Sequence, residues 1–303
     1  MPSMTPLAPK SAVCLIAKNE GPYLLEWIAY HRALGFDEII VYENRSTDNS
    51  AELLENMAKA GIIDHRPWLA GATESPQISA YRDALGKTTA EWILFIDADE
   101  FLVLHRHDSV NAFLAGFDDR PEVTTIGCNW RLFGDSHLSE SDGRLLIDRF
   151  NHAAEVEYPG NRHLKSFTRV RGLGNIVNMH ICETTGAKVH PSGATLNMTD
   201  WGLSDEIELD VAQVNHYYTK TYAEYKVKRA RGYADCADDN AMKYTSYDDD
   251  RFHGGNRNEV VDNSAAKYLP QTRQEIARIE FLVKRSNSPA SKFMNRIRKL
   301  IRA

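Results

Sequence analysis

The chain has few cysteines, and none of them are paired in sequence. Its four cysteines, Cys14, Cys128, Cys182 and Cys236, are widely spaced along 303 residues and form no CxxC pair. Structural zinc sites and disulfide frameworks require clustered cysteines. We therefore expect reduced thiols, as in a cytosolic protein.

Long apolar runs are also missing. Residues 1–20 contain no apolar segment long enough for a signal peptide. Nowhere does the sequence reach the roughly eighteen consecutive apolar residues that a membrane-spanning helix needs. We expect the active domain to be cytoplasmic.

The sequence has no excess of basic residues. It contains 36 Lys and Arg against 42 Asp and Glu, which gives a net charge of -6. Nucleic-acid binding requires a basic face, so we expect no nucleic-acid partner. An anionic ligand can still bind through a metal ion or a local basic pocket. The first predicted strand is not followed by GxGxxG, which argues against a dinucleotide oxidoreductase.

The first third of the chain alternates between apolar strands and amphipathic helices. Short apolar runs predict strands at 12–17, 38–42, 62–67 and 91–96. Helical spacing of apolar residues predicts helices at 22–34, from Ser46 or Asp48 to just before Gly61, and at 77–85. Strands that are apolar throughout predict a mostly parallel α/β sheet flanked by helices on both faces.

The remaining segments have weaker patterns. Residues 1–10 are rich in proline, and we expect them to be disordered. From about residue 129, short aromatic and β-branched runs alternate with glycine, which indicates a smaller antiparallel sheet. Residues 222–232 predict a basic helix.

The motif with the clearest chemical meaning is Asp97-Ala98-Asp99, which directly follows a predicted buried strand. Ligands bind to parallel sheets at the carboxyl ends of their strands, where this motif lies. Two neighbouring carboxylates repel each other unless a cation lies between them. Oxygen ligands of this kind suit Mg²⁺ or Mn²⁺. The alternative is an acidic loop that caps the next helix.

Several further motifs accompany this pair of carboxylates. Together they resemble glycosyltransferases of the GT-A fold, namely family 2 and family 92-like bacterial enzymes. The residues that carry the resemblance are Lys18-Asn19-Glu20, the helix from Glu26 to His31, Asn44–Asp48, Gln77 with Tyr81-Arg82, Asp97–Phe101 and Asn215–Tyr218.

This resemblance implies transfer of a sugar, with inversion, from a nucleotide-sugar donor to a glycan or lipid-linked acceptor. A UDP-sugar is the favoured donor, and Mn²⁺ or Mg²⁺ is the implied cofactor. The implied metal ligands are Asp97, Asp99 and His216. The implied donor-binding residues are Asn19, Glu20, Glu43, Asn44, Arg45, Tyr81, Arg82, Asp97, Lys165, Lys220 and Arg229. The resemblance also implies a donor half at about 11–128 and an acceptor half at about 129–283.

An inverting transfer requires a general base that removes the acceptor's proton. The sequence offers Glu183 and Asp135 as the preferred candidates, with Asp200 as a third. His180 could instead contact the acceptor. These alternatives stay open.

Two other functional classes fit parts of the sequence. A haloacid-dehalogenase-like phosphatase also places Asp-x-Asp after an apolar strand, but it wants Thr or Val where Phe101 stands. A non-catalytic carbohydrate-binding protein would account for the aromatic content, although most of those side chains are needed in the core.

The end of the chain is strongly basic. Residues 284–303 contain seven basic and no acidic side chains, which leaves 29 basic against 42 acidic in the rest. Phe293, Ile297, Leu300 and Ile301 share one face of a helix predicted to begin after Ser291. Such a helix can lie on an anionic membrane, as at the inner face of the plasma membrane, or pack on protein.

Overall fold

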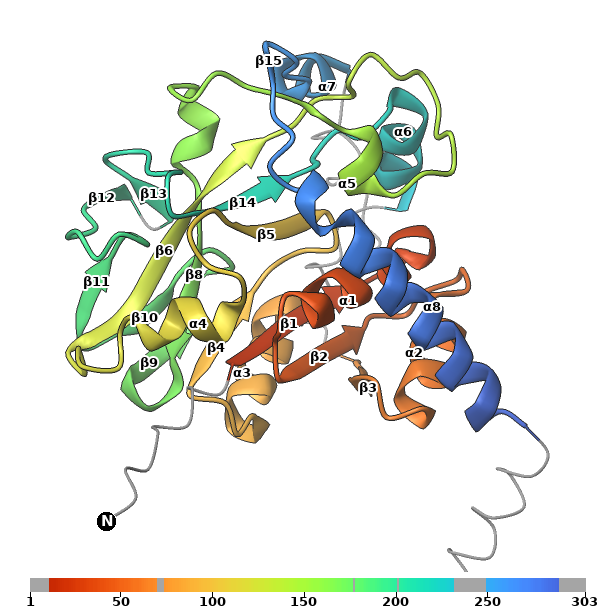
Figure 1. Cartoon of the computed structure of the whole chain (residues 1–303), viewed down its shortest axis with the longest axis horizontal. Coiled ribbons are helices and arrows are strands. Elements are labelled where there is room, and N and C mark those ends of the chain that lie inside the picture. The colour runs from red at the N-terminus through yellow and green to blue at the C-terminus, as the bar shows by residue number, and fades with distance from the viewer. Residues whose placement is uncertain (1–10, 70–73, 177, 201, 232–248, 289–303) are drawn as a thin grey trace, which may run out of the picture.

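The computed structural model describes residues 11–69, 74–176, 178–200, 202–231 and 249–288 (Figure 1). One large sheet runs through the molecule. Its strand order is β3 (Asp64–Pro67), β2 (Glu38–Glu43), β1 (Ser11–Ala17), β4 (Trp92–Phe95), β8 (Leu164–Arg169), β6 (Val123–Leu132), β14 (Ala212–His216) and β5 (Glu100–Leu104), with β11 (Ala187–Val189) beside β6.

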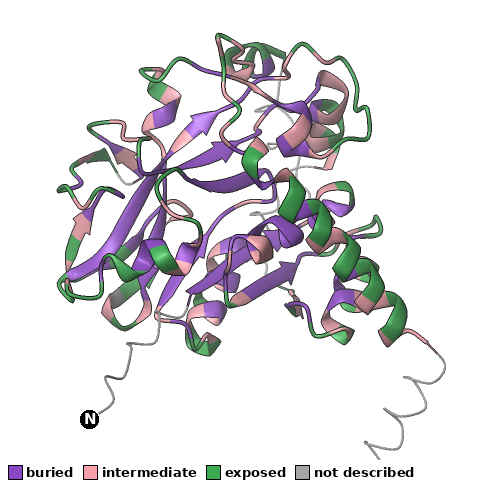
Figure 2. Ribbon diagram, viewed as in Figure 1, coloured by how far each residue is buried: buried purple, intermediate pink, exposed green. Residues whose placement is uncertain are grey.

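Helices cover both faces of the parallel half of this sheet. Alternate residues of β1 point to opposite faces, as the two-residue period of a strand requires. Val13 and Leu15 pack in the cluster that contains Leu24 of α1, whereas Cys14 packs with Tyr81 of α3. Strands β1 and β4 are buried at every residue and β2 at all but its first, whereas the edge strand β3 is partly exposed (Figure 2). On the first face lie α1 (Gly21–Ala33), α2 (Ser50–Lys59), α4 (Val110–Ala115) and α8 (Leu269–Ser286), and on the second lies α3 (Pro76–Lys87).

The predicted α/β class with a mostly parallel central sheet is confirmed. Strands β3, β2, β1 and β4 are all parallel neighbours. Beyond β4 the direction changes, because β8 is antiparallel to both β4 and β6. The predicted boundary between residues 128 and 129 falls inside β6, so the two halves of the chain share this strand.

Smaller elements surround the second half of the sheet. In the described residues, three antiparallel pairs lie outside the main sheet: β9 (Leu173–Ile176) with β10 (Cys182–Thr184), β12 (Met198–Asp200) with β13 (Leu203–Ser204), and β7 (His152–Ala153) with β15 (Val260–Val261). The remaining helical elements are α5 (Leu146–Arg149), η1 (Pro159–Arg162), η2 (Val170–Gly172), α6 (Tyr222–Arg231), α7 (Asp249–Gly255) and η4 (Ala266–Tyr268).

The start of α2 differs from its prediction. The helix begins at Ser50 after Asn49, so neither Ser46 nor Asp48 is the residue before it. Asp48 still caps the start of the helix, because its carboxylate accepts a hydrogen bond from the backbone N–H of Ser50 at 2.9 Å and a second one from Gly21 at 3.0 Å. The Ser46 hydroxyl instead accepts a hydrogen bond from the backbone N–H of Asn19.

The predicted basic helix after Ser291 lies outside the described residues. Lys284 and Arg285 belong to the last turn of α8. In the described segments, no helix combines the length and apolar character needed to cross a bilayer.

Glu26 on α1 connects the core to the second half of the chain. Its carboxylate accepts hydrogen bonds from the backbone N–H groups of Leu146 and Ile147, at 2.7 and 3.1 Å. These are orphan donors of the first turn of α5. Burial raises the pKa of Glu26 to about 7.

We expect a pH-dependent stability difference between the wild type and Glu26→Gln. Because the folded pKa of Glu26 exceeds its unfolded value, its contribution is complete below about pH 4.5 and declines as the pH rises towards about 7. Urea unfolding across this range should show the wild type losing up to about 3 kcal/mol relative to the variant. A constant difference across the range would contradict the assignment.

Candidate active site

The loops that follow β1, β2 and β4 meet at one edge of the sheet. Asn19 connects two of them: its side-chain carbonyl accepts a hydrogen bond from the backbone N–H of Thr47 at 2.6 Å. Its backbone is in the left-handed region, with φ 53°, which asparagine tolerates. Asn19 therefore links the loop that follows β1 to the loop that follows β2.

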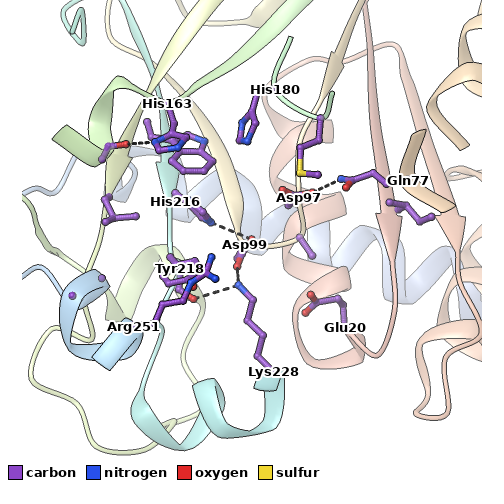
Figure 3. A pocket seen from close by; sticks show the side chains of 18 of the residues that line it. Glu20, Gln77, Asp97, Asp99, His163, His180, His216, Tyr218, Lys228 and Arg251 are labelled. Atoms are coloured by element: carbon purple, nitrogen blue, oxygen red, sulfur yellow. Dashed lines mark hydrogen bonds and ion pairs between the residues drawn. The ribbon is translucent and has the colours of Figure 1, made fainter. Parts of the chain in front are cut away.

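A cavity of about 620 Å³ opens at this edge (Figure 3). Its walls come from the edge loops, from β6 and β14, and from α6 and α7. The lining residues are Ile16, Glu20, Gln77, Asp97, Ala98, Asp99, Trp130, Leu132, Tyr158, Gly160, His163, Met179, His180, His216, Tyr218, Lys228, Arg231, Arg251, Gly254 and Gly255.

Asp97 is held on both carboxylate oxygens. Gln77 donates to Oδ1 at 3.0 Å, and the ammonium of Lys165 lies 2.9 Å from Oδ2. Burial opposes ionisation of Asp97, but the charge of Lys165 outweighs it and holds the pKa below its usual value. Asp97 is an oriented carboxylate whose side chain is 34% exposed.

Lys165 on β8 lies between two carboxylates and is fully buried. Glu100 is its second partner, at 3.2 Å. Burial alone would lower the pKa of Lys165, yet Asp97 and Glu100 together raise it. Burial raises the pKa of Glu100 to about 8, even though Lys165 acts in the opposite direction. The three side chains thus form one coupled group beneath the cavity floor.

Two ammonium groups form ion pairs with the Asp99 carboxylate. Lys228 of α6 lies 2.6 Å from its Oδ2, and Lys220 lies 3.4 Å from the same atom. Burial opposes the ionised form, but these two cations hold the pKa of Asp99 well below its usual value. The carboxylate is therefore ionised and directed into the cavity from the loop between β4 and β5.

His216 ends β14 and faces Asp99. Its Nε2 lies 3.7 Å from Asp99 Oδ1. Burial lowers the pKa of the imidazole to about 3, so the ring is neutral. Its Nδ1 is buried without a hydrogen-bond partner in the described residues. A neutral imidazole beside an ionised carboxylate is a donor pair suited to a divalent metal.

The three predicted metal ligands do not form a closed cluster. In the described ranges, no group of three or more His, Cys, Asp or Glu side chains is arranged to hold a metal ion. Both carboxylate oxygens of Asp97 already have partners, one in Lys165 and the other in Gln77. Asp99 and His216, whose facing atoms lie 3.7 Å apart, are the pair that could supply two ligands to a divalent metal ion.

Helix α6 closes one side of the cavity. Arg231 forms an ion pair with Glu20 at 2.5 Å and donates to the backbone carbonyl of Asn19 at 3.3 Å. At its other end α6 is anchored by Glu224, which pairs with Arg149 and accepts a hydrogen bond from Tyr23 at 2.9 Å. These contacts fix the position of the cationic face that carries Lys228.

Several predicted donor-binding residues support the edge without lining the cavity. Glu43 and Asn44 are buried, and the Glu43 carboxylate accepts a hydrogen bond from the backbone N–H of Ser46. Tyr81 is fully buried and accepts a hydrogen bond from Gln77, the residue that orients Asp97.

Three predicted cations lie away from the cavity lining. Arg45 is exposed. Arg82 pairs with Glu74, and Arg229 lies 3.5 Å from Asp249. The predicted residues that the structure brings together are therefore Glu20, Asp97, Asp99 and His216 at the cavity, with Lys165 and Lys220 behind them.

The carboxylates named as base candidates also lie outside the lining. Asp135 accepts hydrogen bonds from the side chains of Asn256 and Asn258, at 2.9 and 3.1 Å, and so stabilises a loop contact. Glu183 on β10 and Asp200 on β12 are exposed. His180, which the sequence suggested as a contact of the acceptor, does line the cavity.

An aromatic wall faces the carboxylates. Trp130 stacks on His163 with ring centroids 4.6 Å apart and contacts His216 at 4.2 Å. His180 lies 5.4 Å from Trp130. Flat rings with polar edges suit the faces and hydroxyls of sugars.

Sequence reasoning did not single out Lys228 or Arg251. The signal for Lys228 was helical spacing, because it lies one turn after the buried Tyr225 on α6. Arg251 lies on α7, which no prediction included. Trp130 and His163 carry no local motif, and only strand pairing brings them to the cavity.

Comparison with known proteins identifies a family resemblance. The model of glycosyltransferase family 92 matches residues 11–144. A family 92 protein from Ricinus communis is 27% identical over 71% of this chain and 36% of its own length. One from Oryza sativa subsp. japonica is 28% identical over 41% of this chain and 21% of its length. The predicted resemblance to family 92 is confirmed, and the chain spans about a third or less of these relatives.

Solved structures give weaker similarity. Staphylococcus aureus TarS superposes with a TM-score of 0.35 at 15% identity, over 53% of this chain and 28% of TarS. Glucosyl-3-phosphoglycerate synthase from Mycobacterium tuberculosis, in complex with Mn²⁺, uridine diphosphate and glucosyl-3-phosphoglycerate, has a TM-score of 0.31 at 21% identity, over 41% of this chain and 44% of that one.

Proposed function

We propose that this chain transfers a sugar from a nucleotide-sugar donor to a glycan or lipid-linked acceptor. The observation that carries the proposal is the Asp97-Ala98-Asp99 loop, which faces the cavity beside Lys228 and Arg231. The family 92 match, residues 11–144, includes this loop and both preceding edge loops. A nucleoside diphosphate is the ligand class that combines ribose hydroxyls with anionic oxygens, and this site offers partners for both.

The donor would lie along the edge loops. The loop from Asn19 to Glu20 and the loop after Glu43 would surround the nucleoside, with Asp97 accepting hydrogen bonds from hydroxyl groups. Lys228 and Arg231 would bind the diphosphate, since ammonium and guanidinium groups form strong charge-assisted hydrogen bonds with phosphate oxygens. A UDP-sugar is the proposed donor.

A divalent cation, Mn²⁺ or Mg²⁺, is the proposed cofactor. Asp99 and His216 would hold it, because their facing atoms lie 3.7 Å apart and the imidazole is neutral. When bound, the ion would neutralise negative charge on the departing diphosphate. In this structure the ammonium of Lys228 balances the charge of Asp99. A bound metal ion would take over that role, so Lys228 would then be able to move to the phosphate oxygens.

The aromatic wall would bind the acceptor. Trp130, His163 and His180 face the carboxylates across the cavity and come from the second half of the chain. No separate nucleophile is evident at the cavity in the described residues, so we propose a single displacement with inversion. The anomeric configuration of the first-formed product, read by NMR, tests this. Contact of the basic tail with an anionic membrane stays a prediction.

The proposal is tested by a thermal-shift screen of UDP, GDP, CMP and dTDP with and without Mn²⁺. We expect UDP to raise the melting temperature, and Mn²⁺ to increase the shift. Lys228→Met should weaken UDP binding about ten- to hundredfold, because it removes a charged hydrogen-bond donor.

The matched control for this screen is Lys59→Met. Lys59 forms an exposed ion pair with Glu55 on α2, and neither residue lines the cavity. Its replacement should leave UDP binding unchanged. If no nucleotide shifts the melting temperature of the wild type, the proposed donor class is wrong.

A further inference from the structure

Each carboxylate that lines the cavity forms an ion pair with a basic side chain. In the described residues, Glu20 pairs with Arg231, Asp97 with Lys165 and Asp99 with Lys228. A carboxylate held by an ammonium or guanidinium group is a weak proton acceptor, because accepting a proton would leave its partner's charge uncompensated. The proton of an acceptor hydroxyl therefore needs a different destination.

His180 presents a ring nitrogen that can accept it. Its Nδ1 lies 3.1 Å from the backbone carbonyl oxygen of Leu164. A carbonyl oxygen can only accept a hydrogen bond, so Nδ1 carries the hydrogen. In a neutral imidazole Nε2 then carries the lone pair. The ring lines the cavity, and Figure 3 shows it on the wall beside His163 and Asp97.

The backbone around His180 is held in place, although it belongs to no helix or strand. Asn178 accepts hydrogen bonds from the N–H groups of His180 and Ile181, at 2.8 and 3.0 Å. The hydroxyl of Ser166 donates to the His180 carbonyl at 3.2 Å. A Cβ at Gly202 would come within 2.5 Å of the His180 Cβ, so only glycine leaves room for this packing.

We infer that His180 is the general base of the proposed transfer. This rests on the proposed function and names a catalytic residue for it. As the acceptor hydroxyl oxygen attacks the anomeric carbon, the hydroxyl proton moves to Nε2 of His180. A bond forms between the acceptor oxygen and the anomeric carbon. The bond from that carbon to the diphosphate breaks, and the diphosphate leaves with the electron pair.

The charge environment is consistent with this role. Burial, followed by the charge of Lys165, lowers the pKa of His180 to about 4, so the ring is neutral at neutral pH. A bound diphosphate brings negative charge that counteracts Lys165 and makes Nε2 more basic. His163 has the same tautomer, because its Nδ1 lies 3.0 Å from the Gly160 carbonyl oxygen, but it is stacked against Trp130. His163 therefore provides a matched comparison.

The first experiment measures UDP release with water as acceptor. UDP-glucose, UDP-galactose and UDP-N-acetylglucosamine are the donors, and the fastest wild-type reaction is used. His180→Gln should lower kcat by about 10²- to 10⁴-fold with little change in donor KM. His163→Gln should lower kcat by less than about tenfold. Added imidazole should restore part of the activity of His180→Gly, which a packing role would not allow.

The outcomes separate the two proposals. A kcat of His180→Gln within about tenfold of the wild type would overturn the assignment of the base while leaving the transfer function standing. Absence of UDP release by the wild type with every donor and metal would overturn the function and, with it, the base. A ¹⁵N-histidine NMR spectrum of the full chain tests the tautomer independently of activity. A hydrogen on Nε2 of His180 would refute the inference.

Discussion

Asp99→Asn is expected to lower the transfer rate by about a thousandfold or more, because it removes a cavity carboxylate that faces both His216 and the cationic helix α6. Mn²⁺-dependent binding of UDP should be lost as well. Isothermal titration of UDP with and without Mn²⁺ measures the second effect directly. The variant also leaves two ammonium groups without their counter-ion. We therefore expect a loss of about 3–5 kcal/mol in unfolding free energy.

Loss of activity must be separated from loss of stability. Asp99→Asn combined with Lys228→Met removes one of the uncompensated cations and should recover part of the stability, but not the activity. Asp142→Asn is the control, because Asp142 forms an exposed ion pair with Arg144. It should change stability by less than about 1 kcal/mol. Full transfer by Asp99→Asn without metal would contradict the proposed role.

Lys165→Met is expected to destabilise the fold by about 3–5 kcal/mol. The methionine would leave Asp97 and Glu100 facing each other without the ammonium that lies 2.9 and 3.2 Å from them. Glu100 can relieve this by taking up a proton, since burial already raises its pKa to about 8. The penalty should therefore grow as the pH rises, because the folded variant must then hold that proton more strongly than the unfolded chain does.

A double-mutant cycle measures the coupling in this buried group. Above about pH 8, where Glu100 is ionised, Lys165→Met with Glu100→Gln removes one positive and one negative charge together, so it should recover much of the lost stability. Urea unfolding of the wild type, both single variants and the double variant gives the coupling energy. Additive effects of the two substitutions would show that Lys165 and Glu100 do not stabilise each other.

The sequence was sufficient to predict the parallel half of the sheet. Strands β1 and β2 are short apolar runs that are each followed by a helix, and the apolar run of β4 follows α3, so the local pattern indicates parallel strands. It could not predict that β5, β6, β8 and β14 extend the same sheet. Their pairing joins segments as distant as Phe101 and Asn215, and no local period records such pairing.

Some residues of the candidate site could likewise be predicted from the sequence, and others could not. Asp97 and Asp99 could be predicted because both lie in one short motif at a strand end, and His216 came from the family resemblance. The preferred base candidates, Asp135 and Glu183, were carboxylates chosen by type and position in the chain. The structure places both outside the cavity, where Asp135 binds asparagine side chains. Whether a carboxylate faces a cavity depends on packing, which its neighbours in sequence do not determine.

The sequence by itself determined the strands and helices of residues 11–96, the edge at which ligands bind, and the carboxylates that lie there. These depend on periods of two and 3.6 residues and on the rule that parallel strands end together. Tertiary structure alone decided that Lys165 lies between Asp97 and Glu100, that Lys228 neutralises Asp99, and that His180 faces them with its tautomer set by Leu164. Electrostatic interactions depend on separation in space, and separation along the chain does not specify it.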